Sequence, residues 1–253
     1  RGYGLLFGKT PEVFANGVYA QEGTFEGNTK KSSAYQTWSS LPVDPPAVPN
    51  TPVSNWVSVD HPGNGLMATA ALRAALASGA DTIYLPHGLY EIDENIVIPP
   101  TVQRIVGMFS TIKAVANESL DVSQPLFRTS NGTVNLMLEK LNFTGALNGL
   151  TTLEHAGART LTLRDVTMEG KKSVRRLAGA GTLFVESFSG GQFVLEGTSN
   201  SWMRQVNIES DGGTCISNGT GRLWVHGLKS QGQCTVIKNT GGNVEVMSAL
   251  LHA

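Results

Sequence analysis

Residues 136–141 read Leu136-Met-Leu-Glu-Lys-Leu141, and similar strand-like segments follow at a nearly constant spacing. The others are Leu161-Thr-Leu-Arg-Asp-Val166, Leu183-Phe-Val-Glu-Ser-Phe188, Trp202-Met-Arg-Gln-Val206, Leu223-Trp-Val-His-Gly-Leu228 and Val244-Glu-Val-Met247. Their first residues lie 25, 22, 19, 21 and 21 positions apart, each after a turn rich in Gly, Asn, Ser or Thr. Such a period is typical of stacked units that bury their apolar faces against their neighbours.

The repeat favours a parallel β-helix over a leucine-rich repeat. The segments lack the internal Leu-x-x-Leu-x-Leu pattern of leucine-rich repeats, and no helix-period stretch lies within them. Asn and Gly suit the corners because they adopt left-handed backbone angles at little cost. We therefore predict an all-β fold, a right-handed single-stranded parallel β-helix.

Composition narrows the function classes. The 253 residues carry a net charge of −1 and only 15% charged residues, whereas nucleic-acid binding requires a basic surface. No apolar run approaches the roughly 18 residues of a membrane span. The five histidines show no metal-ligand spacing, and no cofactor is expected. Because the chain opens on Arg1, we expect a processed or trimmed piece, and the missing signal peptide says nothing about secretion. The expected location is secreted or cell surface.

The chain divides into three predicted parts. Residues 1–40 form an aromatic arm or the end of a preceding domain, residues 41–53 a Pro-rich linker, and residues 54–253 the β-helix. Near the start of the third part, Leu66 to Ser78 is predicted to be a helix with Asn64 as its N-cap and Gly79 as its stop.

The region after this helix resembles the opening of pectate-lyase-superfamily β-helices, which include tandem-β-helix glucanases and phage tailspikes. The matching residues are Asp81-Thr-Ile-Tyr-Leu-Pro-His-Gly-Leu-Tyr90 and Ile96-Val-Ile-Pro-Pro-Thr-Val-Gln-Arg-Ile-Val-Gly107. The resemblance covers roughly residues 54–250. It implies that the helix caps the N-terminal end of the coil stack, but the family hosts many activities and some purely structural proteins.

Two functions follow from this resemblance. One is action on, or binding of, polysaccharide by a hydrolase or lyase. The alternative is a non-catalytic module of an extracellular fibre, sheath or adhesin that assembles head-to-tail. Enzymatic relatives carry a Gly-Asp-Gly-x-x-Asp-Asp-Thr run before the cap helix, whereas this chain has His61-Pro-Gly-Asn-Gly-Leu-Met-Ala-Thr69. Whether the protein is an enzyme stays open.

Strand alternation predicts two outward columns of side chains on successive coils. The polar column is Glu139, Arg164, Glu186, Gln205 and His226. One interpretation is a surface ladder of opposite charges, each pair worth ~0–1 kcal/mol. The other is a catalytic row of Glu186, Glu139 and Arg164, with the two carboxylates ~9.6 Å apart by coil spacing. A neighbouring guanidinium opposes the raised pKa that a general acid needs.

The apolar column is Met137, Thr162, Phe184, Met203 and Trp224. Three interpretations remain: a cover supplied by the chain itself, a contact with another subunit or domain, or a platform on which sugar rings stack. For the third, the expected substrate-binding residues are Trp224, Phe184 and His226.

Two further features are an acidic group and a pair of cysteines. Asp165, Glu169, Glu209 and Asp211 form an acidic group near strand ends, which we interpret as solvated corners. Cys215 and Cys234 lie on adjacent coils. Cys215 is opposite Val236 if Asn218 stacks on Asn239, or opposite Thr235 if Gly212 stacks on Gly232, and we expect two free thiols.

The C-terminal strand suggests self-association. Residues 244–253 begin a coil without a closing turn or cap, and an uncovered β-helix end exposes unpaired backbone groups. We expect either further sequence or head-to-tail pairing of residues 1–40 of one copy with residues 244–253 of the next.

Overall fold

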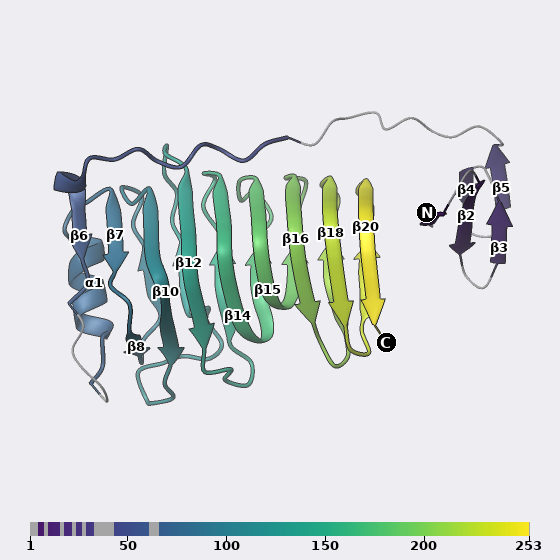
Figure 1. Ribbon diagram of the computed structural model, residues 1–253. Helices are drawn as coiled ribbons and strands as arrows, with labels where there is room; N and C mark the ends of the chain where they lie inside the picture. Colours follow the sequence, from purple (N-terminus) through teal and green to yellow (C-terminus); the bar gives the residue numbers. More distant parts are fainter. Residues whose placement is uncertain are drawn as a thin grey trace. The chain divides into compact units, whose positions relative to one another are not determined.

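The computed structural model describes the backbone of five short strands within residues 1–42, residues 43–60, and residues 66–252 (Figure 1). Side chains are described from 43 to 60 and from 66 to 251. The chain forms two compact units, Arg1–Val43 and Asp44–Ala253, and each is described by itself. The assignment of residues 1–40 as an arm or the end of a preceding domain, and of residues 41–53 as a linker, stays a prediction.

The first unit contains short antiparallel strands. β1 (Leu5–Phe7), β2 (Thr10–Ala15) and β3 (Val18–Gln21) form one sheet in that order. β4 (Thr24–Glu26) pairs with β5 (Thr29–Ser32) in a second.

The second unit is a parallel β-solenoid, which confirms the predicted fold class. Nine strands pair in parallel along its main path, in the order β6, β7, β10, β12, β14, β15, β16, β18, β20. They span Trp56–Ser58, Thr82–Leu85, Arg104–Ala114, Leu136–Thr144, Leu161–Arg176, Leu183–Leu195, Ser201–Glu209, Leu223–Gln231 and Val244–His252. The right-handed sense stays a prediction.

The longer strands bend to form three faces. The start of β10 pairs with β7 on the first face, and its end pairs with β8 (Leu89–Ile92) on the second face. One bent strand therefore joins the two faces. The third face contains β9 (Ile96–Ile98), β11 (Phe127–Thr129), β13 (Thr151–His155), the ends of β14 and β15, β17 (Thr214–Asn218) and β19 (Thr235–Asn239).

The bend between the first two faces is made by one left-handed residue in each coil from β10 to β20. Seven residues in register have positive φ: Phe109, Lys140, Asp165, Ser187, Gln205, Gly227 and Ser248. In β12, Leu138 points into the core, Glu139 and Lys140 do not, and Leu141 returns to it. The bend therefore shifts strict alternation by one residue.

A short helix packs on the core near the start of the solenoid. α1 spans Thr69–Ala77, with Ala68 as its N-cap and no side-chain cap hydrogen bond. The prediction of a helix starting at Leu66 with Asn64 as N-cap is therefore wrong, and Asn64 itself lies outside the described residues. Leu72, Ala75 and Leu76 are buried in the core cluster, whereas the capping role stays a prediction.

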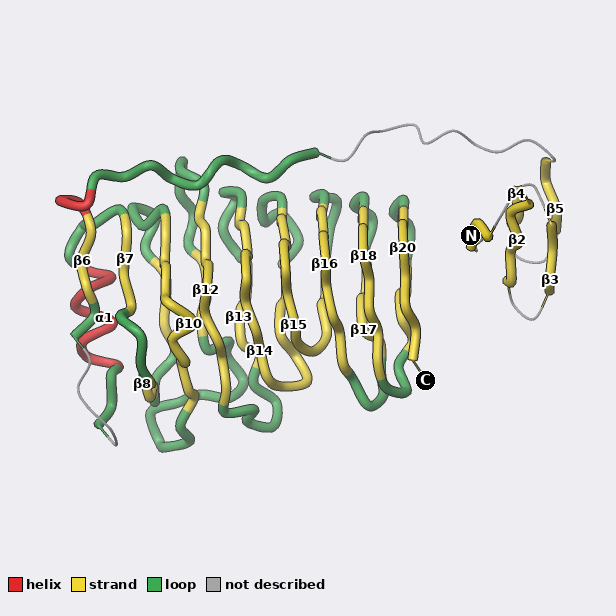
Figure 2. The backbone as a smooth tube through the Cα atoms, in the orientation of Figure 1, coloured by secondary structure: helices red, strands yellow, loops and turns green. Residues whose placement is uncertain are grey.

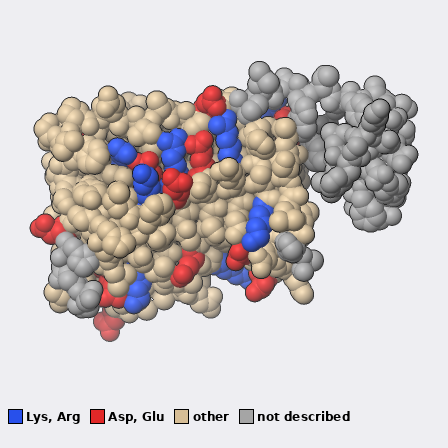
Figure 3. Space-filling model, viewed as in Figure 1, with Lys and Arg blue, Asp and Glu red and all other residues tan. Residues whose placement is uncertain are grey.

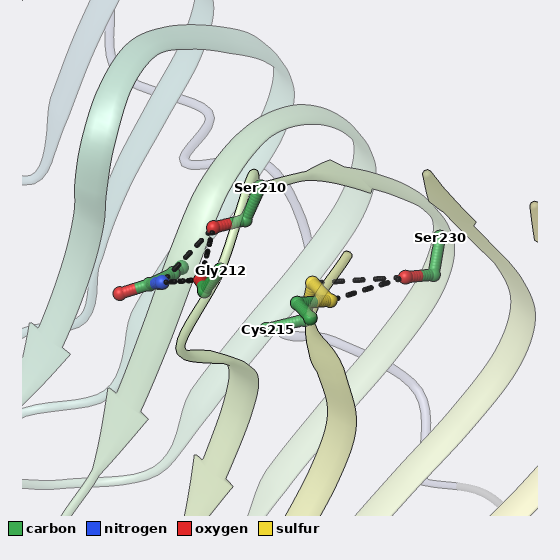
Figure 4. Close-up of a disulfide and its surroundings, with 6 residues drawn as sticks. Ser210, Gly212, Cys215 and Ser230 are labelled. Carbon is green, nitrogen blue, oxygen red and sulfur yellow. Dashed lines mark hydrogen bonds between the residues drawn. A yellow bond between two sulfur atoms is a disulfide. The ribbon is translucent and has the colours of Figure 1, made fainter. Parts of the chain in front are cut away.

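The expectation of two free thiols is wrong. Cys215 and Cys234 form a disulfide with Cα atoms 5.9 Å apart (Figure 4). Cys215 does lie opposite Val236, the first of the two predicted registers. The expectation of free thiols assumes that Cys234 belongs to an extended strand. It precedes β19, and its N–H donates to the Gly232 carbonyl in a turn where Gly232 has φ +97°, which brings the cysteine back toward its neighbour.

Candidate functional site

The polar column exists on the first face, with one correction. The strand registers align Glu139, Arg164, Glu186, Arg204 and His226, so Arg204 stands where Gln205 was predicted. We call this set the polar row. Gln205 instead occupies the left-handed bend.

The cause of the misalignment is a polar residue at a core position. Ser201, rather than Trp202, is in register with Leu183 and Leu223. Its hydroxyl accepts a hydrogen bond of 2.8 Å from the buried guanidinium of Arg176. A serine and an arginine therefore occupy positions where the repeat predicts apolar side chains.

Ion pairs run along the polar row, and Figure 3 shows alternating positive and negative side chains across this face. Arg164 donates to Glu186 at 2.7 Å, and Arg204 lies 3.5 Å from the other oxygen of Glu186. Glu139 is buried and pairs with Arg104 rather than with Arg164. Both candidate catalytic carboxylates are thus bound by arginines.

A shallow hollow of about 510 Å³ lies over the middle of the row. It is lined by Arg164, Glu186, Arg204 and His226 together with the bend residues beside them. His226 is exposed and its ring packs edge-on against Trp224 at 5.5 Å. The structure thus brings Glu186, Arg164 and His226 together, whereas Glu139 is outside this lining.

The apolar column is also confirmed with one correction. Trp202, not Met203, aligns with Phe184 and Trp224, because Met203 points into the core beside Val185 and Val225. We call Met137, Thr162, Phe184, Trp202 and Trp224 the stripe. All five side chains are buried, at 1–6% exposure. In this structure no sugar platform is available on the stripe.

A segment of the chain itself crosses this face. Residues 44–52, called the strap here, run along the solenoid in Figure 2 from the level of β16 toward β6. Asp44 forms an ion pair with Arg204 of β16 at 2.8 Å. Thr51 hydrogen-bonds through its hydroxyl to Thr82 of β7 at 2.7 Å. These contacts favour the first of the three interpretations, a cover supplied by the chain.

The predicted acidic group is divided between two places. Asp165 lies at the bend and lines the hollow of the polar row. Glu169, Glu209 and Asp211 line a second hollow of about 490 Å³, together with Lys171. Glu209 is 54% exposed and lies 3.7 Å from Lys229, in agreement with solvated corners. The Gln192 amide donates to the Ser210 hydroxyl and to the Gly212 carbonyl, both at 2.9 Å, and Figure 4 shows Ser210 and Gly212 side by side.

Sequence reasoning missed two buried arginines at coil corners. Arg159 donates to the carbonyl oxygens of Val102, at 2.7 Å, and Pro99, at 3.1 Å. Arg176 donates to those of Asn200, at 2.9 Å, and Glu196, at 3.1 Å. Burial lowers the pKa of each to about 10. The sequence gives little sign of their burial, because an arginine in a turn between strands is ordinarily expected to be exposed to solvent.

His155 lies beside these arginines and is fully buried. Its Nδ1 is 2.9 Å from the Thr129 hydroxyl. Burial, and then the positive charges of Arg176 and Arg159, lower its pKa to about 4. It is therefore a neutral core histidine at pH 7.

Among the residues whose side chains are described, no group of three His, Cys, Asp or Glu could hold a metal ion. No helix of the described part is both long and apolar enough to cross a membrane.

No protein-family model matches the chain, and no curated protein matches it. Among solved structures the chain is similar to ORF18 of Geobacillus virus E2, with a TM-score of 0.30 and 10% sequence identity. The similarity covers 96% of this chain and 68% of that one. At this level it carries no inference. The solenoid assignment rests on the strand registers, and membership of the pectate-lyase superfamily stays a prediction.

Proposed function

We propose that the chain is a structural solenoid module of an extracellular assembly and has no catalytic centre on its first face. One observation carries the proposal. Glu139 and Glu186, the carboxylates best placed for catalysis, are both bound by arginines, and the aromatic side chains beside them are buried. The polar row fits a charge ladder that stabilises coil stacking.

Two features support the extracellular assembly. Disulfides such as Cys215–Cys234 persist in oxidising compartments and on virion or cell surfaces. In addition, β20 exposes Leu250 and Leu251 at 56% and 57%. Neighbouring exposed leucines on one strand form an apolar surface that favours association. The proposed occupant is a second copy, through its residues 1–40, in head-to-tail order.

Sedimentation velocity over a concentration series tests the assembly. We expect larger species as concentration rises, and a shift toward monomer in the variant Leu250→Asp/Leu251→Asp. Val97→Asp is the matched control, because Val97 is 60% exposed on β9, away from the β20 edge. A chain that stays monomeric at every concentration, or equal effects of both variants, would contradict the assembly.

Polysaccharide binding or cleavage is the second candidate, favoured by the hollow that exposes Glu186, Arg204 and His226 together. A glycan panel with assays for reducing ends and unsaturated products tests it, with Glu186→Gln as the decisive variant. If the unaltered chain releases product from a glycan and Glu186→Gln does not, the protein is an enzyme and the structural proposal is wrong. Activity that survives the substitution would remove Glu186 from consideration.

A further inference from the structure

We propose that the stripe is a recognition site for a proline-rich segment in the polyproline II conformation, covered here by the chain's own strap. The partner chemistry is an acidic residue followed by prolines three residues apart, as in Asp44-Pro-Pro-Ala-Val-Pro-Asn-Thr-Pro52. The inference is independent of the proposed function.

Specific polar contacts hold both ends of the strap. At one end, the Asp44 carboxylate accepts from the Arg204 guanidinium, which also lies over the Trp224 ring at 5.9 Å. At the other end, the Trp56 indole N–H donates to the Thr51 carbonyl at 3.1 Å, and the Thr51 hydroxyl meets Thr82. A passive linker needs no such contacts at either end.

Between its two ends the strap passes four further coils of the solenoid. From β16 to β7 the intervening strands are β15, β14, β12 and β10. The first three carry Phe184, Thr162 and Met137, which are 6%, 1% and 2% exposed. These side chains are outward-facing by register, so their burial requires a cover.

The dimensions of a polyproline II helix match the coil spacing. Seven residue steps from Asp44 to Thr51 span ~22 Å at 3.1 Å per residue, and five rungs from β16 to β7 span ~24 Å. One polyproline turn of three residues rises ~9.3 Å, close to the ~9.6 Å of two rungs. A side chain repeated every third residue therefore meets an equivalent place on every second coil.

The middle of the strap shows this spacing at two of its prolines. Pro46 and Pro49, three residues apart, are half-buried, as is Pro45, whereas Ala47 and Val48 between them are exposed. Pro52, past the contact of Thr51, is exposed and has φ −56° and ψ 144°, close to the polyproline II values. Proline pre-sets this backbone, so little conformational entropy is lost when the segment docks on an apolar groove.

The site must accept the same segment when it is supplied as a separate molecule. In the native chain the tethered strap competes at an effective concentration in the millimolar range. A second copy's strap carries identical chemistry, so weakening the tethered strap makes the stripe accessible to it.

A buried cysteine provides the readout in the full-length chain. Thr162→Cys places one free thiol on the stripe under the middle of the strap, and Thr167→Cys places one at an exposed site on the same strand as a control. We expect maleimide to label Cys at position 162 far more slowly than at 167. Pro46→Ser/Pro49→Ser should speed labelling at 162 about tenfold, and Ala47→Ser/Val48→Ser less than about twofold.

A synthetic peptide spanning residues 42–54 completes the test. At millimolar concentration it should slow labelling at position 162 in the Pro46→Ser/Pro49→Ser background, and a peptide carrying the same two serines should not. Labelling at 167 should not change in any background. Rapid labelling of position 162 in the native strap, equal effects of the two double variants, or no protection by the native peptide would each overturn the proposal.

Discussion

The arginines of the polar row and the arginines of the coil corners place the same side chain in opposite settings. Arg164 and Arg204 are partly exposed and bind carboxylates. Arg159 and Arg176 are 3% and 0% exposed, and neither forms an ion pair with a carboxylate within the described residues. They bind backbone carbonyl oxygens instead.

The difference shows which charges hold the solenoid together. A partly exposed ion pair is screened by water and salt and stabilises by ~0–1 kcal/mol. A buried guanidinium satisfies several carbonyls that the coil corner would otherwise leave without partners, and each unsatisfied buried group costs about 1–3 kcal/mol. The charges that look functional in the sequence are therefore the weaker contributors to stability.

Arg176→Ala is the largest expected effect. The change removes the donors to Asn200, Glu196 and Ser201, and we expect the free energy of unfolding to fall by about 4 kcal/mol. Urea denaturation followed by circular dichroism measures it. Arg175→Ala is the matched control, because Arg175 is the adjacent residue, with a side chain 46% exposed in ion pairs, and should lose no more than about 1 kcal/mol. Equal losses would break the comparison.

The second prediction concerns pH, through His155. Its folded-state pKa of about 4 lies below the ordinary 6.5, so the unfolded chain takes up a proton first as the pH falls. Stability from this residue is full above pH 6.5 and is lost down to pH 4, by about 2 kcal/mol between pH 6.5 and 5. Denaturant titrations at both pH values should show a smaller decrease in His155→Gln than in the unaltered chain. A decrease of the same size in His155→Gln and in the unaltered chain would contradict this assignment.

The smallest expected effect is on the polar row. Removing the Arg164–Glu186 pair with Arg164→Met and Glu186→Gln should give a coupling energy of about 0.5 kcal/mol in a double-mutant cycle, reduced at high salt. A coupling above about 2 kcal/mol would mean that this row, too, behaves as a buried network.

Much of the solenoid was predictable because its signal is periodic. The segments starting at Leu136, Leu161, Leu183 and Leu223 align in the structure as their sequences suggest. The segment predicted to start at Trp202 is misaligned by one residue. Periodicity indicates Trp202 as its first core residue, whereas Ser201 occupies that position. No local rule predicts that a distant Arg176 will satisfy a buried serine.

The candidate site was predictable only in part, for a related reason. Alternation placed Glu139, Arg164 and Glu186 correctly on one column, because these residues precede the bend. It could not predict which arginine binds which carboxylate, nor the contact of Asp44 with Arg204, which are 160 positions apart in sequence. Contacts at that separation depend on how a segment crosses the coils, and the repeat contains no information about that.

The left-handed residue shared by the coils from β12 to β20 has a consequence for how the solenoid tolerates insertions and deletions. From Lys140 to Ser248 the bend falls at the same register position. A whole coil of this run could be duplicated or removed and its neighbours would keep their pairing. Loss of one residue before the bend would instead move a core leucine into the corner. A two-residue difference is accommodated, because β10 has Gly107, Met108 and Phe109 where β12 has Lys140 alone.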